Sequence, residues 1–560
     1  PPDLPMHPAM KTCPRASVRL ARAFSLATVF TGFSSGALIA ADGAWNVSAS
    51  GDWGDITKWN AGAGPVADGV GAIANFNVLA NQSITLDADR TVGRLNFTNS
   101  ANMLSSANGS VLTLAAAGGT PVIDGSATIS ATLAGTQGLS FQPGGFRDLK
   151  LSGNNTYTGV TSVASGGKLY VLSSNALGAA GPGNGTSLTY ADNANVQLVF
   201  NSSAGPLVVR EDVLMRMTAS GGGDGAVTGR YLIVNENAAN STTLQGTLTL
   251  DRASTTSNGR AVTDYFGVQA VGTLNLEGAI TGAASAGQTT STSFDPTRLQ
   301  INATTATANV NIGGEISDGA ITVGGVSVYT ALTSLGVVRL SGENTYTGST
   351  VHQKGTLLVN NTAGSGTGVG AVSVAATATF GGTGIVAPSG SNGVTFAAGS
   401  IVAPGDVDSS GDSIAAGKTL TFDLSNTTGT VDFQAGAAIS IDLNGDSATV
   451  AESFAFIGLD EGVAGVLFNG NTVNFSVGGA ALADGLYTLA TFDAANAYSG
   501  GWVIGAGLED YADRNLQLIF NADSIQLQIG TGAIPEPASA VALGAFVALG
   551  FAAVGRRRRG

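Results

Sequence analysis

Histidine and cysteine, the side chains most used as catalytic bases, nucleophiles and soft-metal ligands, are almost missing from this chain. Its 560 residues hold two histidines, His7 and His352, and one cysteine, Cys13. A zinc site needs several nitrogen or thiolate ligands, and one histidine cannot supply them. The sequence therefore predicts no metal site, no cofactor and no catalytic residue. A serine triad through His352 is an alternative, but we expect His352 to be an exposed turn residue.

Adjacent carboxylates are the next candidates for chemistry. Glu211-Asp212 and Glu509-Asp510 are neighbours in sequence. Because neighbouring residues on a strand point to opposite faces, neither pair forms a general acid and base by itself. Carboxylates or basic groups that converge only in space, as in β-helix polysaccharide lyases and hydrolases, cannot be recognised in one sequence.

One acidic segment is similar to the beginning of a calcium loop. Residues 406–412 read Asp-Val-Asp-Ser-Ser-Gly-Asp. The twelfth position of such a loop is a bidentate glutamate, whereas this chain has Gly417 there. We expect a polar turn, with calcium binding as the alternative.

Composition favours a packed β protein. Gly accounts for 81 residues, charged residues for 11% and hydrophobic residues for 43% of the chain. Low charge with many apolar residues disfavours disorder. The net charge of −14 argues against nucleic acid as a partner.

Short segments of alternating apolar and polar residues recur along the middle of the chain. Examples are 246–250 (Gly-Thr-Leu-Thr-Leu) and 272–276 (Gly-Thr-Leu-Asn-Leu), separated by Gly, Asn and Ser turns. Alternation places one face of a strand inward, and recurrence every 20–30 residues is typical of solenoid coils. A single coil cannot bury its inner face, but stacked coils form a continuous core. We expect on the order of 20 coils.

Two nonapeptides nearly repeat. Residues 151–159 (Leu-Ser-Gly-Asn-Asn-Thr-Tyr-Thr-Gly) match 340–348 at eight of nine positions, and strand-like segments follow at 167–171 and 355–359. This pattern resembles the autotransporter-associated β-strand repeat of bacterial passenger domains. The resemblance implies a right-handed parallel β-helix, that is, a β-solenoid with β-rich terminal regions.

The two ends of the chain are predicted to be targeting segments. Lys11, Arg15, Arg19 and Arg22 precede the uncharged stretch 23–39, and small residues follow. This is the order of a secretory signal peptide. Near the other end, the uncharged stretch 538–555 has about the length of a transmembrane helix. Arginines after such a helix stay on the cytoplasmic side.

The C-terminal pattern carries a second resemblance. It consists of a short motif, the apolar stretch 538–555 and an arginine cluster; the motif and cluster residues are Pro535, Glu536, Pro537, Arg556, Arg557, Arg558 and Arg559. The pattern resembles the PEP-CTERM sorting signal of Gram-negative bacteria. That resemblance implies an exosortase-like processing enzyme as partner, a temporary inner-membrane anchor, and delivery to the envelope, the outer surface or the extracellular matrix.

Composition also suggests domain boundaries. The expected regions are 1–41 (signal peptide region), 42–135 (N-terminal β region), 136–418 (β-solenoid), 419–530 (C-terminal β region) and 534–560 (sorting signal). Trp45, Trp53 and Trp59 lie in the second of these. They could cap the first coil, be scattered core aromatics, or be exposed for stacking on sugars.

The sequence as a whole favours an exported, non-enzymatic structural or adhesin-like protein of the cell surface or extracellular matrix. Exopolysaccharide or other envelope components are the expected further partners. Two alternatives remain: a secreted polysaccharide lyase or hydrolase on the same scaffold, and a glycan-binding module with aromatic side chains exposed in a row.

Overall fold

We analysed a computed structural model of the chain. It describes residues 40–62, 64–77, 81–164, 166–190, 196–217, 230–252, 265–284, 298–319, 326–328, 336–406, 418–444 and 452–530. The predicted signal segment 1–39, the segment 407–417 and the sorting signal, including Pro535, Glu536, Pro537 and Arg556 to Arg559, lie outside these residues. No helix among the described residues has the length and apolar character needed to cross a membrane.

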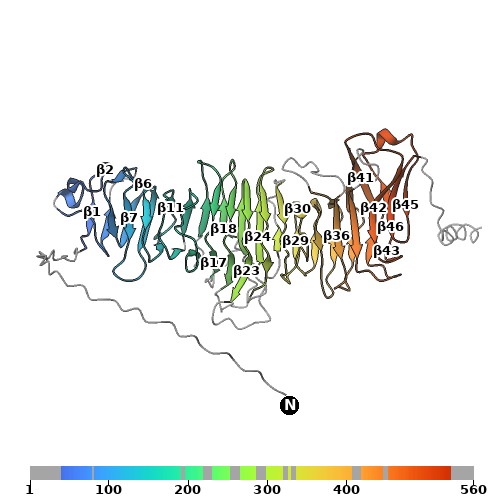
Figure 1. The fold of residues 1–560 in the computed structure, drawn as a ribbon, viewed down its shortest axis with the longest axis horizontal. Coiled ribbons are helices and arrows are strands. Elements are labelled where there is room, and N and C mark those ends of the chain that lie inside the picture. Colours follow the sequence, from blue (N-terminus) through green and yellow to red (C-terminus); the bar gives the residue numbers. More distant parts are fainter. Residues whose placement is uncertain are drawn as a thin grey trace, which may run out of the picture. The chain divides into compact units, whose positions relative to one another are not determined.

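The described chain is built from β-strands that stack in parallel, coil upon coil, in the order of the sequence (Figure 1). From β18 to β27, and again from β31 to β44, each coil contributes one strand to each of three ladders, which we call A, B and C. The all-β solenoid expected from the sequence is confirmed. The hand of its coil stays a prediction.

Ladder A runs through most of the stack. In stacking order it contains β2 (Gly51–Asp52), β4 (Ser83–Leu86), β6 (Arg94–Ser106), β8 (Val122–Ile129), β11 (Arg147–Leu151), β13 (Gly167–Val171), β15 (Gln197–Phe200), β18 (Arg230–Asn235), β21 (Tyr265–Ala270), β24 (Arg298–Ala303), β27 (Val326–Val328), β29 (Thr350–His352), β31 (Val372–Val374), β34 (Val394–Phe396), β37 (Val431–Phe433), β40 (Val466–Phe468) and β43 (Tyr498–Ser499). These 17 described strands are in line with the expected order of 20 coils.

Ladder B is an 11-stranded sheet. It contains β16 (Leu207–Val209), β19 (Thr242–Leu244), β22 (Thr273–Leu276), β25 (Asn309–Ile312), β28 (Val337–Leu340), β30 (Gly355–Val359), β32 (Ala378–Gly382), β35 (Ile401–Pro404), β38 (Ala438–Asn444), β41 (Asn471–Gly478) and β44 (Trp502–Ile504). A separate three-stranded sheet precedes it, made of β5 (Arg90–Val92), β7 (Val111–Leu114) and β9 (Thr132–Ala134).

Ladder C begins with the first strand of the structure. It contains β1 (Gly43–Trp45), β3 (Ile73–Phe76), the first halves of β6 and β8, β10 (Leu139–Phe141), β12 (Val160–Val163), β14 (Gly185–Tyr190), β17 (Val213–Met217), β20 (Leu248–Arg252), β23 (Ile280–Ala284) and β26 (Ile316–Ser317). Backbone hydrogen bonds from Thr345 to Ile316 and from Gly366 to Ile385 continue it. The last strands are β33 (Ile385–Val386), β36 (Thr419–Asp423), β39 (Ser453–Ile457), β42 (Gly485–Phe492), β46 (Ser524–Ile529) and β45 (Leu516–Phe520).

The core is a column of side chains in register. Every second residue of β8 is buried, as the alternation in the sequence predicts. In ladder A, Leu149 pairs with Leu169, which pairs with Leu198, and all three are fully buried. Burying such a side chain stabilises the fold by about 1.5–3 kcal/mol. The inner face of one coil is thus covered by the next.

Aromatic side chains close the first coil. Trp45, Trp53 and Trp59 are fully buried, and the ring of Trp59 lies 5.4 Å from that of Trp45 and 5.2 Å from that of Trp53. The indole N–H of Trp53 donates to the Ala67 carbonyl. The 3-10 turns η1 (Ile56–Lys58) and η2 (Asn60–Gly62) carry this segment. The capping role is supported, whereas exposure for stacking on sugars was wrong.

The other end of the stack is closed differently. Strand β46 runs antiparallel to β42 and to β45, which breaks the parallel ladder. The parallel order of ladder C therefore ends at β42. The 3-10 turn η3 (Glu509–Tyr511) precedes β45 and β46, and the ring centre of Trp502 lies 5.2 Å from that of Phe468.

Candidate functional site

The first nonapeptide forms a corner that holds three successive coils together. Asn155 is buried. Its side-chain oxygen accepts from the Leu133 N–H of the preceding coil at 2.9 Å, and its side-chain nitrogen donates to the Ala176 carbonyl of the following coil at 2.6 Å. One amide group therefore satisfies two backbone groups that would otherwise be buried without a partner.

The second nonapeptide makes the same corner. Asn344 accepts from the Ile316 N–H at 2.8 Å and donates to the Gly366 carbonyl at 2.6 Å. Tyr346 bonds the Thr350 hydroxyl at 2.5 Å, as Tyr157 bonds that of Thr161 in the first copy. The repeated residues therefore have a structural role, and the side chains exposed around the corner are the candidates for binding.

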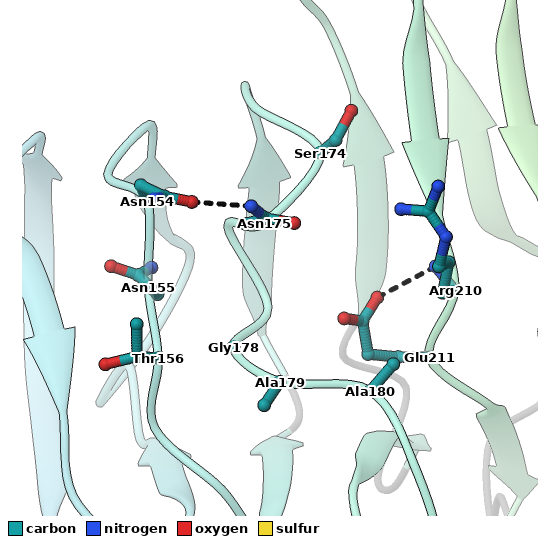
Figure 2. Close-up of a pocket in the computed structure, with 10 residues that line it drawn as sticks. All are labelled: Asn154, Asn155, Thr156, Ser174, Asn175, Gly178, Ala179, Ala180, Arg210 and Glu211. Atoms are coloured by element: carbon teal, nitrogen blue, oxygen red, sulfur yellow. Dashed lines mark hydrogen bonds between the residues drawn. The ribbon is translucent and has the colours of Figure 1, made fainter.

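The corner of the first copy displays a pocket of about 340 Å³ that is lined mostly by polar residues (Figure 2). Its walls come from three successive segments; the lining residues are Asn154, Asn155, Thr156, Ser174, Asn175, Gly178, Ala179, Ala180, Arg210 and Glu211. Asn175 donates to Asn154 at 2.5 Å across neighbouring coils. This hydrogen bond fixes the two exposed amides at the mouth of the pocket.

Glu211 supplies the one carboxylate of this pocket. The residue is 3% exposed, and its Oε2 accepts from the Arg210 N–H at 3.1 Å. No salt bridge between described residues includes Glu211 or Arg210. Burial raises the pKa of the Glu211 carboxyl, while backbone hydrogen bonds and the Arg210 charge oppose that shift.

A second pocket has a volume of about 440 Å³. Its lining residues are Lys150, Ser152, Tyr170, Leu172, Ser173, Asn201, Ser203 and Ala204. The Lys150 ammonium lies 5.2 Å from the centre of the Tyr170 ring. Ser173 lines this pocket and Ser174, its neighbour, lines the first. The turn after β13 therefore contributes to both pockets.

Several pocket side chains differ between the two copies of the repeat. The second nonapeptide has Glu343 where the first has Asn154, and Arg339 precedes it where the first has Lys150. The strand after it, β30, has Leu358, which is buried, where β13 has Tyr170. The corner bonds are shared by both copies, whereas the displayed groups belong to the first copy.

The expectation for His352 was wrong. This residue ends β29 and is fully buried. Its Nε2 lies 3.0 Å from the Gly355 carbonyl and 2.9 Å from the Thr379 carbonyl. A ring nitrogen held between two backbone carbonyls links consecutive coils, so His352 is a core residue and not a turn residue.

Neither acidic pair lies on a strand: residues 211–212 precede β17, and residues 509–510 lie in η3. Glu211 is buried while Asp212 is exposed and accepts from the Thr247 N–H at 2.8 Å. Glu509 lies in η3, where two hydrogen bonds from the Gly507 N–H lower its pKa. Among the described residues, no three His, Cys, Asp or Glu side chains are grouped as metal ligands.

The chain is similar to one known adhesin over part of its length. It is 34% identical over 194 residues, which is 34% of this chain, to the adhesin BmaC autotransporter of Brucella suis biovar 1 (strain 1330). The matched stretch covers 5% of that protein. No family model matches the chain. The likeness supports autotransporter-associated repeats and leaves the PEP-CTERM prediction untested.

Proposed function

We propose that this protein is an exported, non-enzymatic β-solenoid that acts at the cell surface or in the extracellular matrix as a structural, adhesin-like component. The observation that carries the proposal is the corner motif: Asn155 and Asn344 clamp successive coils in the same way. Similarity to an autotransporter adhesin over 194 residues adds support. A stiff stack of coils suits display away from a membrane.

A polysaccharide hydrolase with its active site in the corner pocket is the less favoured function. Glycosidases use two carboxyl groups flanking the scissile bond, about 5–9.5 Å apart. The corner pocket has Glu211 as the single carboxylate among its lining residues. A single carboxyl group can bind a sugar hydroxyl. It cannot act as both of the two carboxyl groups that a glycosidase requires.

Sorting through an exosortase-like enzyme is part of the proposal. It rests on the sequence of Pro535, Glu536 and Pro537, the apolar stretch that follows and the arginines from Arg556 to Arg559. Mass spectrometry of the mature protein is expected to find the C-terminus near Pro535. An intact chain ending at Gly560 in the inner membrane would contradict this route.

Deletion of the gene tests the adhesin-like role. Cells that lack the protein are expected to lose adherence or aggregation several-fold, and a copy of the wild-type gene should restore it. As a control, a copy with Arg556 to Arg559 replaced by alanine keeps the solenoid but alters the predicted sorting signal. Unchanged adherence of the deletion strain would contradict the proposal.

A further inference from the structure

The first corner carries two pockets, and the turn after β13 contributes to both of them. One is lined by Lys150 and Tyr170, and the other by Asn175, Arg210 and Glu211; we name the two together the corner groove. We propose that the corner groove binds a saccharide chain. This inference rests on the proposed surface function and adds the chemical class of the ligand.

Hydrogen-bonding groups in the corner groove suit a polyhydroxylated ligand. The exposed Arg210 side chain can donate hydrogen bonds, and the buried Glu211 carboxylate can accept them. The side-chain amides of Asn154 and Asn175 can both donate and accept. A sugar ring offers hydroxyl groups that donate and accept at short intervals. Because Glu211 and Arg210 take part in no salt bridge between described residues, a ligand does not have to break one.

Tyr170 supplies an aromatic face. The electron-rich face of an aromatic ring attracts partial positive charge, which the C–H groups of a pyranose ring carry. Tyr170 is half-buried in β13, and the Lys150 ammonium lies over its ring, 5.2 Å from the ring centre. A sugar that stacks on this face therefore takes the place of the Lys150 ammonium, which can then donate to a sugar hydroxyl. The polar groups of the other pocket lie beyond Ser173 and Ser174.

The corner groove is held in place before any ligand binds. Asn155 ties its three coils together, Asn175 donates to Asn154, and Asn201 donates to Glu236 of the next coil at 3.3 Å. Groups that are already ordered lose little entropy on binding. The geometry thus favours recognition by fixed side chains.

A peptide is a less suitable occupant. Extended peptides bind most often by adding a strand to an open sheet edge. In the corner groove, β13 already pairs with β11 on one side and with β15 on the other. The backbone N–H and C=O groups of β13 are therefore already used in the sheet, and a ligand at this strand meets side chains only.

The test is binding of the full-length purified protein to an oligosaccharide microarray that carries neutral hexose, N-acetylhexosamine and uronate chains. Hits are then titrated by calorimetry. Tyr170→Ala and Arg210→Ala are each expected to weaken binding at least tenfold. Phe146→Ala is the matched control, because Phe146 is 77% exposed just before β11 but lines neither pocket; its binding should stay within twofold of the wild type.

Three outcomes would overturn the inference: no oligosaccharide is bound, both pocket variants bind as the wild type does, or Phe146→Ala weakens binding as much as they do. Arg210 is exposed, so Arg210→Ala decides the matter if Tyr170→Ala fails to fold. Surface labelling of intact cells separates the two proposals. Labelling without sugar binding removes this inference alone, and absence of labelling removes the proposed function.

Discussion

Asn155 and Asn344 make the same pair of hydrogen bonds from different faces of the solenoid. The first follows β11, a strand of ladder A, and the second follows β28, a strand of ladder B. The two copies of the nonapeptide are therefore offset by one face. Each hydrogen bond links only adjacent coils. The motif can therefore make the same contacts at more than one corner of the solenoid.

Removing the Asn155 amide should open its corner locally. In Asn155→Ala the buried Leu133 N–H and Ala176 carbonyl lose their partner, and each such group costs about 1–3 kcal/mol. We expect the Leu133 amide to exchange its hydrogen at least tenfold faster. Asn154→Ala is the control, because Asn154 is exposed. Equal exchange at Leu133 in both variants would contradict the clamp.

Gly178 should not accept a side chain. A Cβ there would lie 2.5 Å from the Tyr157 carbonyl oxygen, and φ is +91°. Gly181 also has a positive φ, +128°, but nothing lies within 4 Å of its Cβ position. We expect Gly181→Ala to cost about 1 kcal/mol of unfolding free energy and Gly178→Ala about 2–5 kcal/mol. Chemical denaturation followed by circular dichroism measures both, and equal costs would contradict the close approach.

The buried Glu211 carboxyl should make stability depend on pH. Its pKa is raised in the folded state, so the folded protein holds the proton more tightly than the unfolded chain does. The stability from this group is complete below the unfolded pKa of about 4.3 and is lost as pH rises through the folded pKa. In Glu211→Gln the Tm at pH 4.5, relative to the Tm at pH 7, should be lower than in the wild type. If the difference in Tm between the two pH values is the same in Glu211→Gln and in the wild type, the Glu211 carboxyl is not buried as described.

The first coil should depend on its tryptophans. Trp59→Ala removes a fully buried ring that contacts Trp45, Trp53 and Phe76, and such truncations cost about 3–5 kcal/mol. In a stack of coils the loss stays near the substitution. We expect faster hydrogen exchange in β1 and β3 with β42 and β46 unchanged. Uniform loss of protection along the chain would contradict independent coils.

Alternation and repetition made much of this fold predictable. The period of two predicted which side of β8 is buried, and the two nonapeptides implied a β-solenoid. That both copies form the same corner was learned from the structure. The domain boundaries at 135 and 418 stay predictions. The antiparallel end at β46 was not predicted, since strand direction depends on the path of the chain and not on local composition.

The corner groove could not be predicted in the same way. Tyr170 and Arg210 belong to neighbouring coils, and the number of residues between coils varies along the chain. His352 was misjudged for a related reason: its neighbours Gln353 and Lys354 are polar, yet the strand turns the imidazole inward between two carbonyls. A signal was present in Tyr170, which departs from the apolar residue found in β30.

Lysine labelling of intact cells tests the central claim most directly. A membrane-impermeant amine reagent and mass spectrometry would be applied to intact and to lysed cells, with Lys58, Lys150 and Lys168 as reporters. If the solenoid is displayed outside the cell, these lysines should be modified as fully in intact cells as after lysis. Modification only after lysis would contradict surface display.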